Sequence, residues 1–346
     1  MTKAYSFAIV GATGAVGEKM VQILEGSELP VKQIKLLSSS RSAGSKVMFR
    51  GEEIVVEEAT ANSFVDIDIA LFSAGGDISR KLIPKAVEHG AICIDNTSAF
   101  RMDENVPLVV PEVNEADLFH HQGIIANPNC STIQMVAALE PLNKAFGLKR
   151  VVVSTYQAVS GAGAAAVDEL MEQTTSLLNN EEVTANILPV KSGTKHHQIA
   201  FNCIPQIDQF HENGFTLEEL KMMNETKKIM HLPNLPIAAT CVRLPIVTGH
   251  SESVYIELEQ DGATVKAIQD LLREAAGVTL QDDPSKQFYP MPVKCVNQND
   301  VFVGRIRQDA DIATGFHLWI VSDNLLKGAA WNSVQIAESL VRLEIV

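Results

Sequence analysis

Residues 5–17, Y-S-F-A-I-V-G-A-T-G-A-V-G, are the segment that decides the fold of this chain. A short apolar run leads into three glycines spaced three residues apart, after which Met20, Val21 and Leu24 recur at helical spacing. This order predicts a buried strand, a glycine turn and a helix. Glycines at such a turn let the backbone approach a pyrophosphate, and the N-terminus of a helix favours negative charge. The segment therefore indicates a dinucleotide site, although a tight turn that binds nothing has the same spacing.

The residues after the next strand favour NADP over NAD as the cofactor. An NAD site usually carries an acidic residue about 20 residues beyond the glycines, whereas S-S-S-R-S-A-G, residues 38–44, contains no carboxylate. Its arginine and serines would bind a 2′-phosphate through charge-assisted hydrogen bonds, unless the loop is simply solvated. A third loop, S-A-G-G-D at residues 73–77, ends another strand and is expected over the same crevice. The expected cofactor contacts are Gly11, Thr13, Gly14, Ala15, Val16, Gly17, Ser39, Arg41, Ser42, Ser73, Ala74 and Gly75.

Apolar strands and helices alternate through the first part of the chain, which predicts a parallel, doubly wound sheet. From about Lys149 longer β-branched runs predict a mostly antiparallel second sheet, with strands in R-V-V-V-S-T-Y-Q-A-V, A-T-C-V-R-L-P-I-V, S-V-Y-I-E-L-E and V-F-V-G-R-I-R. We expect an α/β chain with a Rossmann-type domain at 1–129, an α+β catalytic domain at 130–324, and a C-terminal segment, 325–346, that joins the first domain. Further strands are expected at 34–37, 67–72 and 91–94, and helices at 78–88, 164–178, 216–230, 265–276 and 325–343.

Composition and charge argue against several classes of protein. The chain has 346 residues and a formal net charge of -14, whereas nucleic acid or an anionic membrane would need a net basic face. Its five cysteines are scattered and never in C-x-x-C spacing, so neither a disulfide framework nor a zinc site is expected. For the same reason we expect no bound metal. We expect a cytoplasmic enzyme, because the N-terminus lacks a signal peptide's signature and no apolar run approaches ~18 residues.

The segment A-N-P-N-C-S-T-I-Q-M-V, residues 126–136, places Cys130 between an Asn-Pro-Asn turn and an apolar helix. The thiolate is the reactive form of cysteine, and a helix N-terminus lowers the pKa of a thiol. Asn129 can cap this helix, whose free N–H groups can hold an oxyanion or a phosphate oxygen. We therefore expect Cys130 to be a nucleophile. The commoner role of a small buried core residue fits Cys93 better, and also Cys203 and Cys241, which are expected in strands.

A nucleophilic thiol beside a nicotinamide indicates aldehyde chemistry, because a thiolate can add to a carbonyl and retain a thioester after hydride transfer. Among nine histidines, His250 in P-I-V-T-G-H-S-E-S is the best candidate for the acid/base group. Arg243 lies in an apolar run, where a charge generally has a partner or a ligand, and Arg101 stands out in N-T-S-A-F-R-M. Two arginines would suit a substrate with two anionic ends, although pairing with an acidic residue is the commoner fate of each.

Five motifs occur in one order along the chain: G-A-T-G-A-V-G, S-S-R-S-A-G, N-P-N-C-S-T, Y-Q-A-V-S-G-A-G and R-L-P-I-V-T-G-H-S-E. In these motifs the chain resembles the aspartate-β-semialdehyde dehydrogenases over its full length. The resemblance implies that Cys130 is the nucleophile, that His250 is the acid/base and that Gln157 orients the reacting groups or a water. It also implies that Arg243 and Glu225 hold the amino-acid end of the substrate.

The same resemblance implies the remaining contacts and the reaction. Arg101, Asn129 and Lys228 would bind phosphate, and Gly161 and Asn324 would lie near the cofactor. The implied reaction is the reversible, NADPH-dependent reductive dephosphorylation of L-4-aspartyl phosphate to L-aspartate 4-semialdehyde and phosphate, on the route to lysine, threonine and methionine. It proceeds through a cysteine thioester. The family forms homodimers through the second domain, paired in some members into tetramers.

Three alternatives remain at the level of the sequence. N-acetyl-γ-glutamyl-phosphate reductases perform the same chemistry on a longer substrate, but their cysteine motif typically reads G-C-Y-P instead of N-C-S-T. A glyceraldehyde-phosphate-type dehydrogenase would carry a different cysteine motif and no S-S-S-R-S loop. A non-catalytic paralogue would be expected to lose Cys130 or His250, and this chain retains both.

Overall fold

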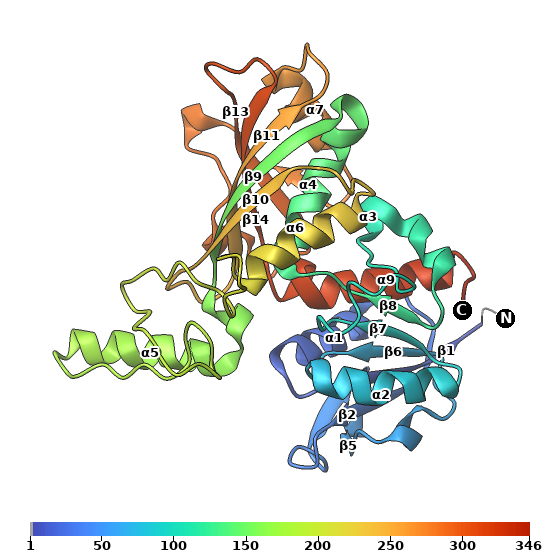
Figure 1. Ribbon diagram of the computed structural model, residues 1–346. Helices are drawn as coiled ribbons and strands as arrows, with labels where there is room; N and C mark the ends of the chain where they lie inside the picture. The colour runs from blue at the N-terminus through green and yellow to red at the C-terminus, as the bar shows by residue number, and fades with distance from the viewer. Residues whose placement is uncertain (1–2) are drawn as a thin grey trace. The chain divides into compact units, whose positions relative to one another are not determined.

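The computed structural model describes residues 3–346, which form two compact units (Figure 1). Unit 1 comprises residues up to Asn129 together with Ala329–Val346, and unit 2 comprises Cys130–Gly328. The expected fold class is confirmed, because unit 1 contains a parallel sheet and unit 2 a mostly antiparallel one.

Unit 1 is built on a six-stranded parallel sheet of order β5-β2-β1-β6-β7-β8. Its strands are β1 (Tyr5–Val10), β2 (Val31–Ser38), β5 (Glu57–Glu58), β6 (Ile69–Phe72), β7 (Ile92–Asp95) and β8 (Ile124–Ala126). A separate hairpin joins β3 (Lys46–Phe49) to β4 (Glu52–Val55). The helices of this unit are α1 (Ala15–Gly26), α2 (Gly76–Glu88), α3 (Pro111–Asn114) and α9 (Trp331–Arg342).

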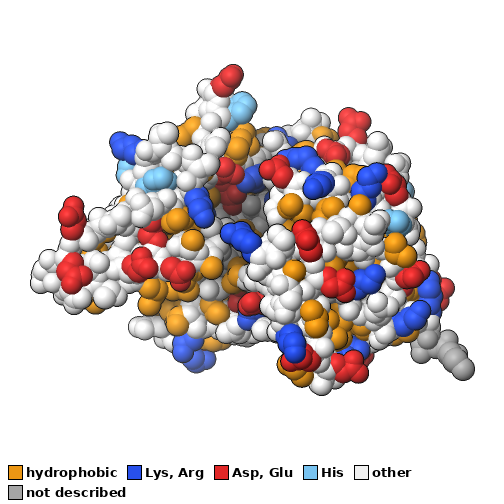
Figure 2. Space-filling view, turned by 90° about the horizontal axis from the view of Figure 1, so that it is seen from below, with side chains coloured by type: hydrophobic (Ala, Val, Ile, Leu, Met, Phe, Trp, Pro, Cys, Tyr) orange, Lys and Arg blue, Asp and Glu red, His pale blue; other side chains and the backbone are white. Residues whose placement is uncertain are grey.

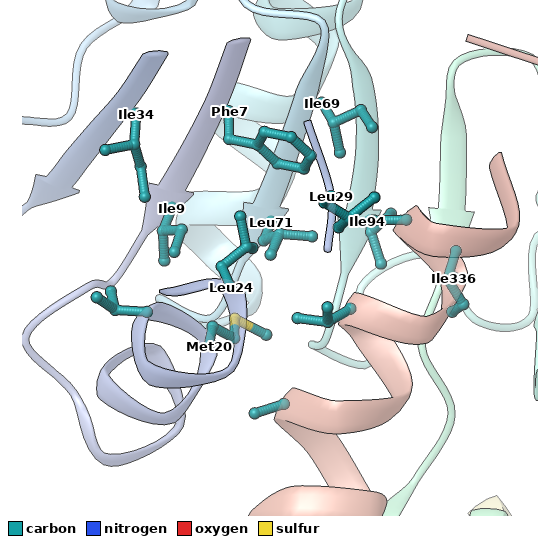
Figure 3. Packing of buried hydrophobic residues seen from close by; sticks show 14 of the residues in the cluster. Phe7, Ile9, Met20, Leu24, Leu29, Ile34, Ile69, Leu71, Ile94 and Ile336 are labelled. Carbon is teal, nitrogen blue, oxygen red and sulfur yellow. The ribbon is translucent and has the colours of Figure 1, made fainter. Parts of the chain in front are cut away.

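All six residues of β1 are buried, because side chains on both faces of this sheet pack under helices. On one face Phe7 and Ile9 join Met20 of α1 and Ile336 of α9 in the cluster of Figure 3. On the other face Ala8 and Val10 join apolar residues of α2. The C-terminal helix is therefore part of the core of unit 1. The expected helix 325–343 is divided, since Leu326–Ala330 form a π-helical turn before α9.

Unit 2 is built on a six-stranded sheet of order β10-β9-β11-β14-β13-β12. Its strands are β9 (Leu148–Gln157), β10 (Ile237–Arg243), β11 (His250–Leu258), β12 (Val278–Leu280), β13 (Val301–Gln308) and β14 (Gly315–Ser322). Its helices are α4 (Cys130–Phe146), α5 (Ala164–Leu178), α6 (Leu217–Ile229), α7 (Val265–Glu274) and α8 (Pro292–Cys295). The sequence patterns did not predict β14 or the short β12. The strands at the two edges of the sheet are parallel to their neighbours, in the pairs β10–β9 and β12–β13.

Alternate burial along β9 and β11 assigns one face of the unit 2 sheet to the interior. Thr155 and Gln157 of β9, Arg243 of β10, and His250 and Glu252 of β11 are buried polar or charged residues. Because parallel β9 and β10 pair Gln157 with Arg243, and antiparallel β11 begins beside them, three functional candidates meet at one end of this face.

No helix of residues 3–346 combines the length and apolar character needed to span a bilayer. Among these same residues, no group of three or more His, Cys, Asp or Glu side chains is arranged to hold a metal ion. Figure 2 shows acidic and basic side chains intermixed over the face in view.

Candidate functional site

The glycine turn of unit 1 has the close backbone packing that a dinucleotide site requires. Gly11 has φ +88°, and a Cβ there would lie 2.6 Å from the carbonyl oxygen of Ser73. A Cβ on Gly17 would overlap the carbonyl oxygen of Gly11, so α1 can begin at Ala15 directly against the turn. Gly14 is exposed at the helix N-terminus, where unpaired N–H groups favour an anion. These residues fit a dinucleotide pyrophosphate.

The polar loop after β2 offers a cation without an internal partner. Arg41 is exposed, and within residues 3–346 its guanidinium forms no hydrogen bond or ion pair. Ser39 is exposed and Ser42 half-buried in the same turn, and Thr13 of the glycine turn hydrogen-bonds Ser38 at the end of β2 (2.8 Å). The two loops are thus joined. The loop of Ser73–Gly75 also reaches them, because Ser73 N–H donates to Val10 O (2.8 Å).

Cys130 is the first residue of α4 and is partly exposed. Gly328 lies against it, since a Cβ on that glycine would be 2.8 Å from Cys130 Cβ. Burial lowers the pKa of the Arg243 guanidinium, whereas the charge of Glu218 and, to a smaller extent, that of the Cys130 thiolate raise it. A helix N-terminus and a buried cation both favour the thiolate.

The other cysteines lack this combination. Cys93 and Cys241 are buried, and burial raises the pKa of both thiols. Burial likewise raises the pKa of Cys295 to about 11. Cys203 is exposed in a loop, so the expectation that it lies in a buried strand is wrong; the apolar residues around it had suggested a strand.

His250, Gln157 and Glu218 form a buried hydrogen-bonded group. Ala158 N–H donates to His250 Nδ1 (3.1 Å), and Gln157 Nε2 lies 3.4 Å from His250 Nε2. Gln157 Nε2 also donates to Glu218 Oε1 (3.1 Å). Burial and the charge of Arg243 lower the pKa of His250 to about 3, despite the opposing charge of Glu218. The imidazole is therefore neutral at physiological pH.

Arg243 lies beside this group with part of its guanidinium unpaired. Its Nη1 donates to Ala158 O (2.7 Å), whereas its Nε has no hydrogen-bond partner among residues 3–346, although the side chain is 4% exposed. A buried unsatisfied donor on a cation is costly unless a ligand completes it. The free edge of the guanidinium fits a carboxylate.

Gly161 and Asn324 lie in unit 2 around His250. A Cβ on Gly161 would be 3.0 Å from Arg243 Nη1 and 3.2 Å from His250 Nε2, so the backbone of residue 161 packs closely against both buried groups. Asn324 Nδ2 donates to Ser160 Oγ (3.0 Å), and its Oδ1 accepts from Gly249 N–H (2.8 Å). Asn324 thereby connects the loops before His250 and around Gly161.

Sequence reasoning missed Glu218, and the structure shows how α6 presents it. Glu219 closes a capping box with Thr216 and accepts from Cys241 N–H (3.0 Å), which fixes the first turn of α6 on β10. Glu218 then contacts Gln157, and Lys221 Nζ lies 3.4 Å from its carboxylate. The expected pair Glu225 and Lys228 has the same spacing of three but lies two helical turns, ~10 Å, further along. The pair Glu218 and Lys221 could have been found from the sequence, because T-L-E-E-L-K, residues 216–221, places them at the same spacing of three.

Arg101 belongs to unit 1 and is 8% exposed. Its Nε donates to Asn127 O (2.9 Å) and its Nη2 to Asn96 O (3.0 Å), so two carbonyls after β7 and β8 orient the guanidinium. Asn129, two residues beyond Asn127, is buried immediately before α4.

Comparison with known proteins identifies related chains over the full length. The family model described as semialdehyde dehydrogenase, NAD binding domain, matches residues 6–121, and that described as semialdehyde dehydrogenase, dimerisation domain, matches residues 139–327. A protein of Bacillus subtilis named aspartate-semialdehyde dehydrogenase is 67% identical over 346 residues, which is 100% of both chains.

Two solved structures are also similar. One is aspartate semialdehyde dehydrogenase II of Vibrio cholerae complexed with ASA, with a TM-score of 0.93, 45% identity and 99% of each chain covered. The other is aspartate semialdehyde dehydrogenase with NADP from Candida albicans, with a TM-score of 0.76, 25% identity, and 99% of this chain and 100% of that chain covered.

Proposed function

Because this chain belongs to the aspartate-semialdehyde dehydrogenase family, we propose that it converts L-4-aspartyl phosphate reversibly to L-aspartate 4-semialdehyde and phosphate with NADPH. The protein is an oxidoreductase of amino-acid biosynthesis, and we place its reaction on the route to lysine, threonine and methionine. The observation that carries the proposal is the buried group of Gln157, Glu218, Arg243 and His250 that adjoins the thiol of Cys130.

NADPH would be held by the glycine turn of unit 1 and the loops after β2 and β6, and when bound it supplies the hydride. Gly11, Gly14 and Gly17 allow the backbone to approach the pyrophosphate. Arg41 is a free exposed cation for the 2′-phosphate, and no carboxylate stands in its loop to repel that group. The similar Candida protein was solved with NADP. Gly161 and Asn324 of unit 2 remain the residues proposed for the nicotinamide side.

Cys130 would carry the acyl group. Its thiolate attacks the carbonyl carbon of the acyl phosphate, the C–S bond forms, and the tetrahedral oxyanion collapses as the C–O bond to phosphate breaks. A thioester remains. After hydride transfer to the thioester carbon, a second oxyanion collapses, the C–S bond breaks, and the aldehyde leaves while Cys130 returns to its thiolate. His250 remains the proposed acid/base group and Gln157 the residue proposed to orient the reacting groups, and the two side chains lie side by side, with Gln157 Nε2 3.4 Å from His250 Nε2.

The amino-acid end of the substrate would bind Arg243 through its unpaired edge, which fits the α-carboxylate. The α-amino group requires a carboxylate, and we assign this role to Glu218 in place of Glu225, because Glu218 contacts Gln157. Lys221 follows Glu218 by three residues, as Lys228 follows Glu225, and its Nζ lies 3.4 Å from the Glu218 carboxylate.

Phosphate binding is proposed for Arg101, Asn129 and Lys228. Arg101 is suited to it because the backbone carbonyls of Asn96 and Asn127 fix its guanidinium, and an arginine can bind phosphate through charge-assisted hydrogen bonds. We also propose that the protein forms a homodimer, which can pair into a tetramer, because the dimerisation-domain family model covers most of unit 2. Light scattering of the purified protein measures the number of subunits.

The test is phosphate-dependent reduction of NADP by the purified protein, with L-aspartate 4-semialdehyde and N-acetylglutamate semialdehyde offered in parallel. We expect turnover with the first substrate alone and complete loss after alkylation with iodoacetamide. The assay is run in a Cys203→Ser background, because the exposed Cys203 is a second target of alkylation. Turnover only with N-acetylglutamate semialdehyde, or no turnover by a folded protein that binds NADPH, would refute the proposal.

A further inference from the structure

The side-chain amides of Asn332, Asn127 and Asn96, all in unit 1, form a hydrogen-bonded row that we term the amide chain. Asn332 Nδ2 donates to Asn127 Oδ1 (2.7 Å), and Asn127 Nδ2 donates to Asn96 Oδ1 (2.6 Å). Asn127 and Asn332 are completely buried. The amide chain therefore connects the C-terminal helix α9 to the loop after β7, and its first bond joins residues 205 positions apart.

The direction of the amide chain is fixed by a backbone carbonyl. Asn332 Nδ2 also donates to Val109 O (3.0 Å), and a carbonyl oxygen can only accept. The NH₂ group of Asn332 therefore faces both Val109 O and the side chain of Asn127, so Asn127 Oδ1 must be the acceptor. The NH₂ group of Asn127 then faces Asn96, whose Oδ1 accepts. Oxygen and nitrogen are thus assigned in all three amides.

The hydrophobic core of unit 1 fixes the helix that carries Asn332. Asn332 is the second residue of α9, and the same helix buries Val334, Ile336 and Leu340 in the core cluster of Figure 3. Burial of an amide costs free energy unless its hydrogen bonds are made, so packing alone would favour an apolar residue at a completely buried position. The partners of Asn332, and not packing, explain the presence of an amide there.

The amide chain ends at the two carbonyls that hold Arg101. Arg101 Nε donates to Asn127 O (2.9 Å), and Arg101 Nη2 donates to Asn96 O (3.0 Å). Both carbonyls belong to residues whose side-chain amides bond to each other. Because Nε and Nη2 form one edge of a planar guanidinium, two acceptors at a fixed separation determine the plane and the direction of the whole group. The amide chain therefore orients Arg101 through the backbone.

Under the proposed function, on which this step rests, Arg101 binds the phosphate of the substrate. Each N–H group must point at an oxygen to make such a bond, so a rotation of the guanidinium weakens phosphate binding. We propose that Asn332 and Asn127 are positioning residues that orient Arg101 toward the phosphate. Helix α9 thereby contributes to phosphate binding, whereas NADPH should bind independently of the amide chain.

An isosteric variant tests the direction of the amide chain. Asn332→Asp keeps the shape of the side chain but replaces its NH₂ group with an oxygen, which would face Val109 O and Asn127 Oδ1. In the oxidation of L-aspartate 4-semialdehyde, KM for phosphate should rise by about tenfold or more, with little change in KM for NADP. Gln335→Glu is the matched control, because Gln335 lies on the same helix and its Nε2 donates to Glu112 Oε1 (3.0 Å). The control should keep wild-type KM values.

Asn332→Ala is a second variant, because it removes the donor without placing an oxygen opposite two acceptors. Its KM for phosphate should also rise, and Arg101→Lys, in which the planar fork itself is lost, serves as the reference. Thermal unfolding monitors the stability of each variant. An unchanged KM for phosphate in the folded Asn332 variants, or an equal rise in Gln335→Glu, would overturn the inference.

NMR without substrate separates the orientation of Arg101 from its role in binding. In the protein labelled with ¹⁵N-arginine, Arg101→Lys identifies the Nε–H resonance of Arg101, which should exchange slowly with solvent because its acceptor is a buried carbonyl. Asn332→Ala should accelerate this exchange by at least about tenfold, and Gln335→Glu should not. An unprotected Nε–H in the wild type, or equal exchange in Asn332→Ala, would contradict the positioning. An unchanged KM for phosphate in Arg101→Lys would instead refute the phosphate site of the proposed function.

Discussion

Replacement of Arg243 by Lys tests the proposed carboxylate site, because the two side chains share a charge but not a geometry. The guanidinium donates from Nη1 to Ala158 O at 2.7 Å and keeps its Nε unpaired and buried. A planar fork can serve both the carbonyl and a substrate carboxylate. The compact ammonium of Lys cannot donate in both directions with this geometry.

The size of the effect follows from the hydrogen bonds lost. One hydrogen bond to a charged group is worth about 1.5–3 kcal/mol, and about 1.36 kcal/mol corresponds to a factor of ten in rate. Loss of one such bond to the substrate therefore lowers kcat/KM by about 10- to 150-fold. Loss of the bond to Ala158 O would leave a buried carbonyl unsatisfied and reduce the free energy of unfolding by about 1–3 kcal/mol.

The assay is steady-state kinetics of Arg243→Lys with L-aspartate 4-semialdehyde, accompanied by urea unfolding. Arg150→Lys is the matched control, since Arg150 lies on the neighbouring strand β9 with a side chain 54% exposed and 3.7 Å from Glu257. The control should keep wild-type kinetics. If Arg243→Lys loses stability but keeps its kcat/KM, Arg243 is a structural residue and the carboxylate must bind elsewhere.

Four further predictions test other parts of the site. Cys130→Ala should abolish turnover but leave NADPH binding intact by fluorescence titration, and residual wild-type turnover would exclude the thioester. Arg41→Ala should weaken the binding of NADPH by about tenfold or more, while the affinity for NADH changes little. Equal losses of affinity for both nucleotides would show that Arg41 does not bind the 2′-phosphate. Glu218→Gln should raise KM for L-aspartate 4-semialdehyde much more than Glu225→Gln does, whereas the reverse order would restore the original assignment to Glu225. Burial raises the pKa of Glu252 well above its usual range, so folding favours its protonated form and the free energy of unfolding falls as pH rises above about 4.3, the pKa of an unfolded Glu. Glu252→Gln should remove this fall, so its stability relative to the wild type should be higher at about pH 8 than at about pH 5 in urea unfolding; the same difference at both pH values would contradict the shift.

The pattern of the sequence alone determined the fold class. Gly11, Gly14 and Gly17 follow a mostly apolar run whose six residues are all buried, because β1 is covered on both faces. Local secondary-structure propensity and hydrophobic periodicity indicate the fold class, because both depend only on residues that are close together in the sequence. The same patterns missed β14, whose run G-F-H-L-W-I-V-S follows β13 after a short loop, and placed Cys203 in a strand. Strand pairing and loop exposure depend on distant contacts, which no local pattern contains.

For the site, the sequence supplied the reactive residue types and the tertiary structure decided their partners. Cys130 was recognisable because its turn and helix are local, and His250 and Arg243 because such side chains are unusual in or beside an apolar run, whereas Gln157 was found only through a motif that the chain shares with a known family. Glu218 was not distinguished from Glu225, because both lie three residues before a lysine on one helix. Only the docking of α6 on β10, through Glu219 and Cys241, selects which of them reaches Gln157. The contact of the Ala158 N–H with His250 likewise joins residues 92 positions apart in the chain, and spatial contact of this kind exists only in the folded protein.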